Sequence, residues 1–240
     1  MTMSKTLLLH IETSGEICSV CLTQNGEVLS ELSAIKERSH SKRLTLLIQE
    51  LCIACDVRLK DLSGVVLSKG PGSYTGLRVG SSVSKGICYS LEIPLIAINT
   101  LTAMASQYCD ESKETLIVPM LLARKEEVYL KVLNGNLDIL QVTTPTQLTK
   151  DFLEPYLTAK INRIVVCGNV TELAQVHFPN LQLIEYHQLE PTALNLTYLS
   201  YDLFQRGKFN DIAYFDLDYI KSPNITTTKK KSLIPSIVKN

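Results

Sequence analysis

The sequence predicts an α/β protein made of two halves that share one order of elements: three strands, helix, strand, helix, strand, helix. Three observations support this class. Short runs of β-branched and aliphatic residues alternate with segments in which apolar residues recur at helical spacing. Turn-forming residues separate these runs. The order found in residues 1–108 returns in residues 109–222, although no sequence repeat is visible.

The first half opens with three strands, predicted at 5–13, 17–24 and 27–34, with Asn25-Gly26 as a hairpin turn. A helix follows, with Ser39 or Ser41 as a candidate N-cap. Its apolar face comprises Leu44, Leu47, Ile48, Leu51 and Cys55. The remaining elements are a strand at 64–68, a glycine-rich loop, a helix at 75–90, a strand at 94–98 and a helix opened by Asn99 or Thr100.

The second half repeats this order, beginning with strands at 115–122, 127–134 and 137–143. A helix is expected to open at Thr144-Pro145, because proline suits the first helical turn. The remaining elements are a strand at 163–167, a short helix, a strand at 181–185 and a helix at 192–206. This pattern is typical of the actin/Hsp70/sugar-kinase (ASKHA) superfold, in which a cleft between the halves is a usual place for ligands.

Composition narrows the function classes. The chain has 240 residues, of which 24 are Lys or Arg and 24 are Asp or Glu, so its formal charge is zero. A nucleic-acid-binding chain usually has a basic face, so binding by this chain alone is not expected. The sequence has no apolar run of membrane-spanning length and no signal peptide, so a cytoplasmic location is expected.

Seven cysteines include two C-x-x-C pairs, Cys18/Cys21 and Cys52/Cys55. The first pair lies on a predicted strand, where residues three apart point to opposite faces. The second pair lies on a helix whose apolar face already includes Cys55. Buried, reduced thiols are therefore expected in place of a zinc site.

The loop "SKGPGSYTGLRVG" leads from a buried strand into a helix. Such a loop can hold a phosphate through backbone N–H groups and the helix dipole, or it can be only a tight turn. Its spacing fits neither the P-loop nor the dinucleotide fingerprint. The turn after the first strand resembles an acidic phosphate-binding hairpin, with a plain polar turn as the alternative. A vestigial phosphate loop would comprise Glu12, Thr13, Ser14, Gly70, Gly72 and Ser73.

The helix after this loop has a face of small residues, Gly76, Gly80 and Ser84, spaced four apart. Interior glycines cost about 1 kcal/mol each relative to alanine, so close packing should offset that cost. Either a partner helix or the protein's own core can supply this packing. On the preceding helix, Leu46 and Ile53 form a second apolar stripe that needs cover. These five residues are the predicted partner interface.

No catalytic or metal-binding set can be assembled from the sequence. His10 shares a strand face with Glu12, but no third ligand is visible, and the sequence contains neither H-E-x-x-H nor G-x-S-x-G. We therefore predict no catalytic residues, no metal and no cofactor.

Four stretches together resemble the TsaB (YeaZ) family, subunits of the bacterial tRNA threonylcarbamoyladenosine (t6A) machinery. They are "LLLHIETSGEICSVCL", "HSKRL", "LSKGPGSYTGLRVGSSVSKGICYSLEIPLIAINTLTAMA" and "PMLLARKEEVYLKVL". The resemblance covers about residues 6–133 strongly, and "FDLDYIKSP" weakly matches the C-terminal tyrosine segment of the family. The family usually has aspartate where Glu12 and Leu122 stand here.

The resemblance implies a non-catalytic dimerisation subunit of the ASKHA fold. Its partners would be a TsaD-like catalytic paralogue and a TsaE-like ATPase, with tRNA bound through the complex and a homodimer formed when the chain is alone. The two helices discussed above would meet their equivalents in a helical bundle, and residual ATP or ADP could bind in the complex. The alternative is an ASKHA-fold small-molecule kinase or a glycoprotease-like enzyme.

The last segment, residues 223–240, is a basic tail that contains Lys229, Lys230 and Lys231. We interpret it as a solvated terminus. The alternative is an arm that contacts tRNA phosphates or the partner.

Overall fold

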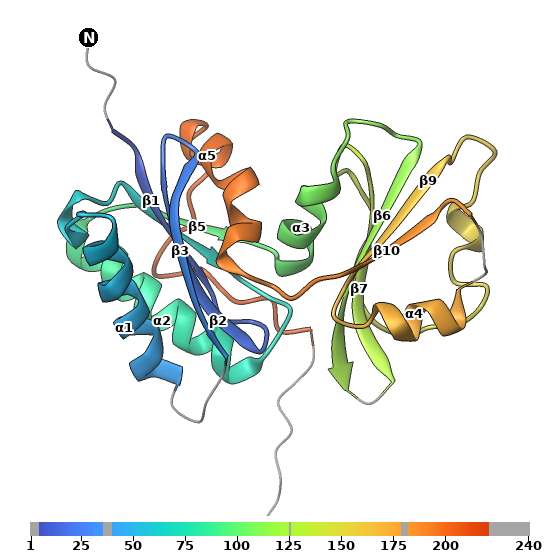
Figure 1. Ribbon diagram of the computed structural model, residues 1–240, viewed down its shortest axis with the longest axis horizontal. Coiled ribbons are helices and arrows are strands. Elements are labelled where there is room, and N and C mark those ends of the chain that lie inside the picture. Colours follow the sequence, from blue (N-terminus) through green and yellow to red (C-terminus); the bar gives the residue numbers. More distant parts are fainter. Residues whose placement is uncertain (1–4, 36–39, 125, 179–181, 221–240) are drawn as a thin grey trace, which may run out of the picture.

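The computed structural model describes residues 5–35, 40–124, 126–178 and 182–220, which form two α/β subdomains side by side (Figure 1). The first subdomain comprises β1 (Leu7–Glu12), β2 (Ile17–Gln24), β3 (Glu27–Ile35), α1 (His40–Ala54), η1 (Leu59–Asp61), β4 (Gly64–Ser68), α2 (Tyr74–Leu91) and β5 (Leu95–Ile98). The connection comprises α3 (Thr100–Ala105) and η2 (Ser106–Tyr108). The second subdomain and the following helices comprise β6 (Thr115–Arg124), β7 (Glu127–Asn134), β8 (Ile139–Gln147), η3 (Glu154–Tyr156), β9 (Arg163–Gly168), α4 (Thr171–His177), β10 (Ile184–Gln188), η4 (Ala193–Leu196) and α5 (Thr197–Gln205).

Both sheets have the same topology. The first has the strand order β3-β2-β1-β4-β5, and the second has the equivalent order β8-β7-β6-β9-β10. In each sheet the first three strands are antiparallel, and the next two add in parallel. The duplication predicted from the order of elements is confirmed. The predicted hairpin turn is confirmed too, because Asn25 and Gly26 both have positive φ, 52° and 90°.

One predicted helix is wrong. At Thr144-Pro145 the chain does not turn into a helix, because β8 continues to Gln147 and Pro145 lies opposite Tyr129 of β7. β8 is the outermost strand, where a residue without an N–H group is tolerated. Only the short η3 follows it, so this half has no counterpart of α1 at this place. The strand predicted at 181–185 forms later, at Ile184–Gln188.

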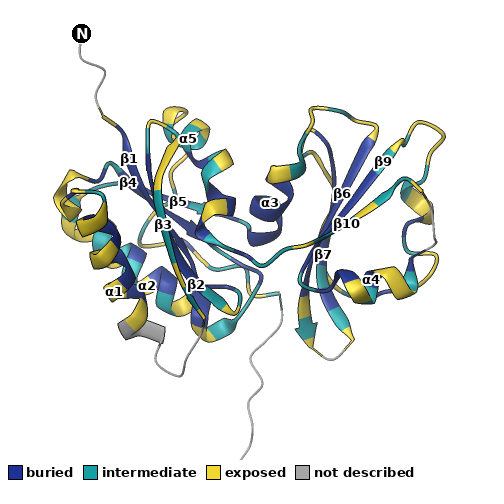
Figure 2. Ribbon diagram, in the orientation of Figure 1, coloured by how far each residue is buried: buried dark blue, intermediate teal, exposed yellow. Residues whose placement is uncertain are grey.

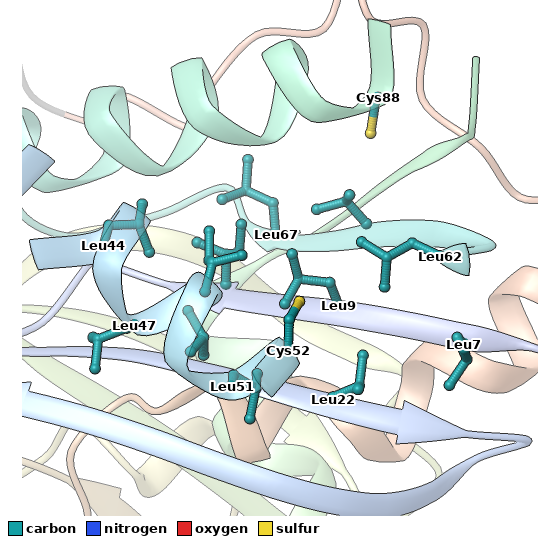
Figure 3. Packing of buried hydrophobic residues seen from close by; sticks show 14 of the residues in the cluster. Leu7, Leu9, Leu22, Leu44, Leu47, Leu51, Cys52, Leu62, Leu67 and Cys88 are labelled. Atoms are coloured by element: carbon teal, nitrogen blue, oxygen red, sulfur yellow. The ribbon is translucent and has the colours of Figure 1, made fainter. Parts of the chain in front are cut away.

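The larger core lies between the first sheet and the two helices α1 and α2 (Figures 2 and 3). Of the apolar face predicted for α1, four residues are buried and Cys55 is half-buried. Figure 3 shows Leu44, Leu47 and Leu51 of α1 in one cluster with Leu9 and Leu67 of the sheet. Full burial of such a side chain contributes about 1.5–3 kcal/mol, so packing holds α1 in place. The candidate N-cap Ser39 lies outside the described residues, as does the side chain of Ser41.

Helices α3 and α5 each follow one subdomain in the sequence and also pack against the other. α3 follows the first sheet, but its Ala105 packs in a cluster with Ile117 and Val165 of the second. α5 follows the second sheet, but its Leu199 packs with Leu8 of the first. These contacts link the two subdomains. The predicted domain boundary near residue 108 stays a prediction.

Two further observations concern the described part of the chain. All seven cysteines are free thiols. None of the described helices combines the length and the apolar character that a membrane crossing requires.

Candidate functional site

The carboxyl ends of β1 and β4 meet at one edge of the first sheet, because the two strands are parallel neighbours. Glu12 ends β1 and is only 1% exposed. Its Oε1 accepts hydrogen bonds from the Ser14 backbone N–H, at 2.5 Å, and from Ser68 Oγ, at 2.7 Å. The carboxylate therefore fastens the loop after β1 to the end of β4.

The loop after β1 and the glycine-rich loop after β4 pack directly against each other. The Ser73 backbone N–H donates to the Ser14 carbonyl at 2.7 Å. A side chain at Gly72 would place its Cβ only 2.5 Å from Ser14 Cβ, so this close approach requires glycine. Gly70 has a φ of +108°, a conformation that favours glycine. Ser73 is the N-cap of α2, and its Oγ accepts from the Gly76 N–H at 3.3 Å. The polar groups of both loops thus hold the loops together.

A cleft of about 420 Å³ lies between the two subdomains. Its lining residues are Ser14, Gly15, Glu16, Pro71, Gly72, Ser73, Tyr74, Leu121, Leu122, Ala123, Arg124, Tyr129, Asn169, Asp218, Tyr219 and Ile220. Of the residues predicted as a vestigial phosphate loop, Ser14, Gly72 and Ser73 line the cleft. The other three, Glu12, Thr13 and Gly70, are buried and are not part of its wall.

One wall of this cleft was not predicted from the sequence. It is formed by the end of the C-terminal strap (residues 210–220), where Asp218, Tyr219 and Ile220 line the cleft. On the strap, Tyr219 lies against Tyr74 at the start of α2, with ring centroids 5.0 Å apart. Arg78 lies 4.0 Å over the Tyr74 ring, and its Nε donates to the Tyr219 hydroxyl at 3.1 Å. Phe215 is buried in the first core, and its carbonyl accepts from Lys85 of α2. The signal for this wall was the weak match of "FDLDYIKSP".

His10 does not take part in the cleft. It is fully buried, with Nδ1 3.2 Å from the Cys21 carbonyl and Nε2 2.8 Å from Ser200 Oγ on α5. Burial lowers the pKa of His10 to about 4, so the imidazole is neutral at physiological pH. Within the described residues, no group of three or more His, Cys, Asp or Glu side chains is arranged to hold a metal ion.

The small face of α2 points into the protein, so the prediction that it receives a partner helix is wrong. Gly76, Gly80 and Ser84 are all buried. A Cβ on Gly80 would overlap Thr13 Oγ1 and would lie 3.2 Å from a methyl group of Leu67. The small residues thus let α2 approach the ends of β1 and β4.

The outer face of α1 and α2, unlike the buried small face of α2, exposes apolar side chains. Leu46 is 47% exposed and Ile53 is 72% exposed. Between the helices runs a groove of about 410 Å³. Its lining residues are Thr45, Ile48, Gln49, Cys52, Ile53, Val57, Leu59, Val83 and Ile87. We call this surface the α1–α2 face; it is an apolar surface that nothing in this chain covers within the described residues.

Comparison with known proteins agrees with this architecture. The family described as TsaD, tRNA N6-adenosine threonylcarbamoyltransferase, matches residues 27–226. The tRNA threonylcarbamoyladenosine biosynthesis protein TsaB of Bacillus subtilis is 32% identical over 168 residues, which cover 69% of this chain and 72% of that protein. TsaB of Haemophilus influenzae is 34% identical over 127 residues, and the match spans 53% of each protein.

A solved structure supports the fold. A Pseudomonas aeruginosa protein described as similar to the peptidase YeaZ superimposes with a TM-score of 0.77 at 23% identity. The match covers 90% of this chain and 100% of that one. At this identity the likeness concerns the fold, which is the duplicated ASKHA architecture that the sequence predicts.

Proposed function

Because the chain belongs to the TsaB branch of the tRNA N6-adenosine threonylcarbamoyltransferase family, we propose that it is a non-catalytic dimerisation subunit of the t6A modification complex. It binds a TsaD-like catalytic paralogue and supports its activity. The proposal also includes a TsaE-like ATPase in the complex, tRNA bound through the complex, and a cytoplasmic location.

The observation that carries the proposal is the α1–α2 face. Ile53 and Leu46 stand on it as exposed apolar side chains, and the groove between the helices is lined mainly by aliphatic residues. Because exposed aliphatic side chains gain free energy when a partner covers them, a helical surface of the paralogue is the expected occupant. A second copy of this chain can cover the same face when the paralogue is absent, which gives the expected homodimer.

The non-catalytic part of the proposal is supported by the cleft loops. A kinase of this fold needs an acidic side chain that reaches the phosphates, but the Glu12 carboxylate faces inward and bonds to Ser14 and Ser68. Ser73 already caps α2. These groups stabilise the loops and are not free to bind a substrate.

Co-expression with the TsaD-like paralogue tests the proposal. We expect the two chains to co-purify, the pair to transfer threonylcarbamoyl to tRNA together with the ATPase, and this chain alone to show neither transfer nor ATP hydrolysis. Turnover by the isolated chain that is lost in Glu12→Gln would contradict the non-catalytic role. Failure of the two chains to associate would contradict the dimerisation role.

A further inference from the structure

Two lysines, one from each subdomain, are linked to Asp218 of the strap, Lys69 directly and Lys131 through Thr102 and Asn99. Lys69 follows β4 in the first subdomain, and Lys131 lies in β7 of the second. Lys131 is only 6% exposed, and its Nζ donates to Thr102 Oγ1 of α3 at 2.7 Å. Burial lowers the pKa of Lys131, and Asp218 counteracts that effect while Lys69 adds to it. Thr102 Oγ1 in turn donates to Asn99 Oδ1 at 3.3 Å, so a chain of hydrogen bonds connects Lys131 to Asn99.

Asp218 is held among these groups by contacts from two segments of the first subdomain. One carboxylate oxygen lies 3.3 Å from Lys69 Nζ, and the other accepts from Asn99 Nδ2 at 3.1 Å. The Asp218 backbone N–H donates to the Lys69 carbonyl at 2.7 Å. Asp218 lines the cleft, whereas Lys69, Asn99 and Lys131 are not among the lining residues.

This cluster contains two ammonium groups and one carboxylate. The Lys131 ammonium is buried, and a buried charge is costly unless it is paired, so the net positive charge of the cluster favours a further anion or the replacement of Asp218 by a more highly charged one. Ammonium groups form strong charge-assisted hydrogen bonds with phosphate and carboxylate oxygens, and the Asn99 amide adds a neutral N–H donor. The carboxylate of Asp218 has the same chemistry as such a ligand.

We propose that Lys69, Asn99 and Lys131 form an oxyanion-binding site that Asp218 of the strap fills as an internal substitute ligand. A phosphate or carboxylate group that enters the cleft competes with Asp218 and displaces the end of the strap. Residues 215–220 form neither helix nor strand, so this end can move without breaking a ladder of backbone hydrogen bonds. The site does not depend on the proposed partner, because the residues of the α1–α2 groove are not among those that line the cleft.

The test compares Asp218→Ala with Asp216→Ala in the full chain. Asp216 is exposed and lies on the same strap, so its loss removes one negative charge without emptying the site. Thermal unfolding is followed with increasing inorganic phosphate and, in a second series, acetate, each at constant ionic strength. We expect phosphate to stabilise Asp218→Ala and to bind it at least tenfold more tightly than it binds the wild type or Asp216→Ala. The double variant Asp218→Ala/Lys131→Met should lose this gain.

The two anions distinguish the ligand classes. A larger effect of phosphate indicates a phosphorylated ligand, and a larger effect of acetate indicates a carboxylate. Equal responses of Asp218→Ala and Asp216→Ala to both anions would overturn the proposal.

A measurement on the unmodified chain decides the matter if Asp218→Ala does not fold. Hydrogen exchange at the Asp218 amide should accelerate in concentrated phosphate or acetate relative to sodium chloride of the same ionic strength, because the bond to the Lys69 carbonyl opens as the strap leaves. Identical exchange in all three salts would show that Asp218 is not displaced and would overturn the proposal.

Discussion

The two subdomains share one sheet topology but differ in the helices that cover it. In the first, α1 has 15 residues and α2 has 18, and together they form an apolar groove on their outer side. In the second, one face is covered by η3 and the seven-residue α4, and the other by the short α3. The two sheets thus share one topology, and within the described residues the longer covering helices belong to the first subdomain.

The two halves also differ in the polar groups that join their elements, which are buried in one network of the first half and exposed in one network of the second. The first half buries His10 and Glu12, which join β1 to α5 and to the cleft loops. The second half has an exposed network in which Arg163 pairs with Glu185 and Asp110. Buried groups fix the geometry of the first half, while the exposed pairs contribute little, because water and salt screen them.

The largest loss of stability is expected from a substitution in the closely packed face of α2. Gly80→Leu should destabilise the fold by about 3 kcal/mol or more, because its side chain overlaps Thr13 and has no space to enter. Gly86 is the matched control on the same helix, since a Cβ there meets nothing within 4 Å. Gly86→Leu should be neutral or stabilise by up to about 0.8 kcal/mol. Denaturant unfolding of both variants measures the difference, and equal stabilities would contradict the internal role of the small face.

The second effect concerns His10 and pH. The pKa of His10 is about 4 in the folded chain, against 6.5 for an unperturbed histidine, so the unfolded chain binds a proton more readily between these two pH values. Neutral His10 therefore contributes to the free energy of unfolding in full above pH 6.5, and this contribution, about 3 kcal/mol in total, is lost as the pH falls toward 4.

The readout for His10 is the free energy of unfolding of wild type and His10→Gln, measured across this pH range. The carboxyl groups titrate in both chains, so the difference between the two curves isolates the imidazole. We expect the wild-type curve to fall more steeply. Parallel curves would show that His10 does not titrate in the way its burial requires.

Most of the sheet topology was predictable from the sequence, because buried strands and turn residues have short-range signals such as Asn25-Gly26. The wrong helix at Thr144-Pro145 shows where such signals fail. Proline suits both the first turn of a helix and an edge strand, and the pairing of Pro145 with Tyr129 depends on contacts distant in sequence.

The site was predictable only in part, for a similar reason. The spacing of Gly76, Gly80 and Ser84 indicates a small face, but spacing alone does not say whether the neighbour is a partner or the protein's own sheet. In the structure, a Cβ on Gly80 would overlap Thr13, which directly follows β1, so the neighbour is the protein's own sheet. Asp218 and Lys69 have no local pattern, since they pair only when the strap returns to the cleft.

The smallest effect is expected in the exposed network of the second half. Arg163 holds the pKa of Glu185 down at about 2, but the Glu185 side chain is 45% exposed, so the stabilisation is largely screened. Glu185→Gln should cost less than about 1 kcal/mol of unfolding free energy, and this cost should shrink in high salt. A cost as large as that of Gly80→Leu would show that the second half depends on its surface charges.

The central claim is that the α1–α2 face binds the catalytic paralogue, and the affinity of Ile53→Lys tests it most directly. Val176→Lys is the matched control, because Val176 is 74% exposed and also lies near the end of a helix, but in the second subdomain. Isothermal titration with the TsaD-like paralogue should show Ile53→Lys weakened by about 2 kcal/mol, roughly 30-fold, with Val176→Lys unchanged. Wild-type affinity in Ile53→Lys, with a loss in Val176→Lys, would contradict the account and assign the partner to the second half.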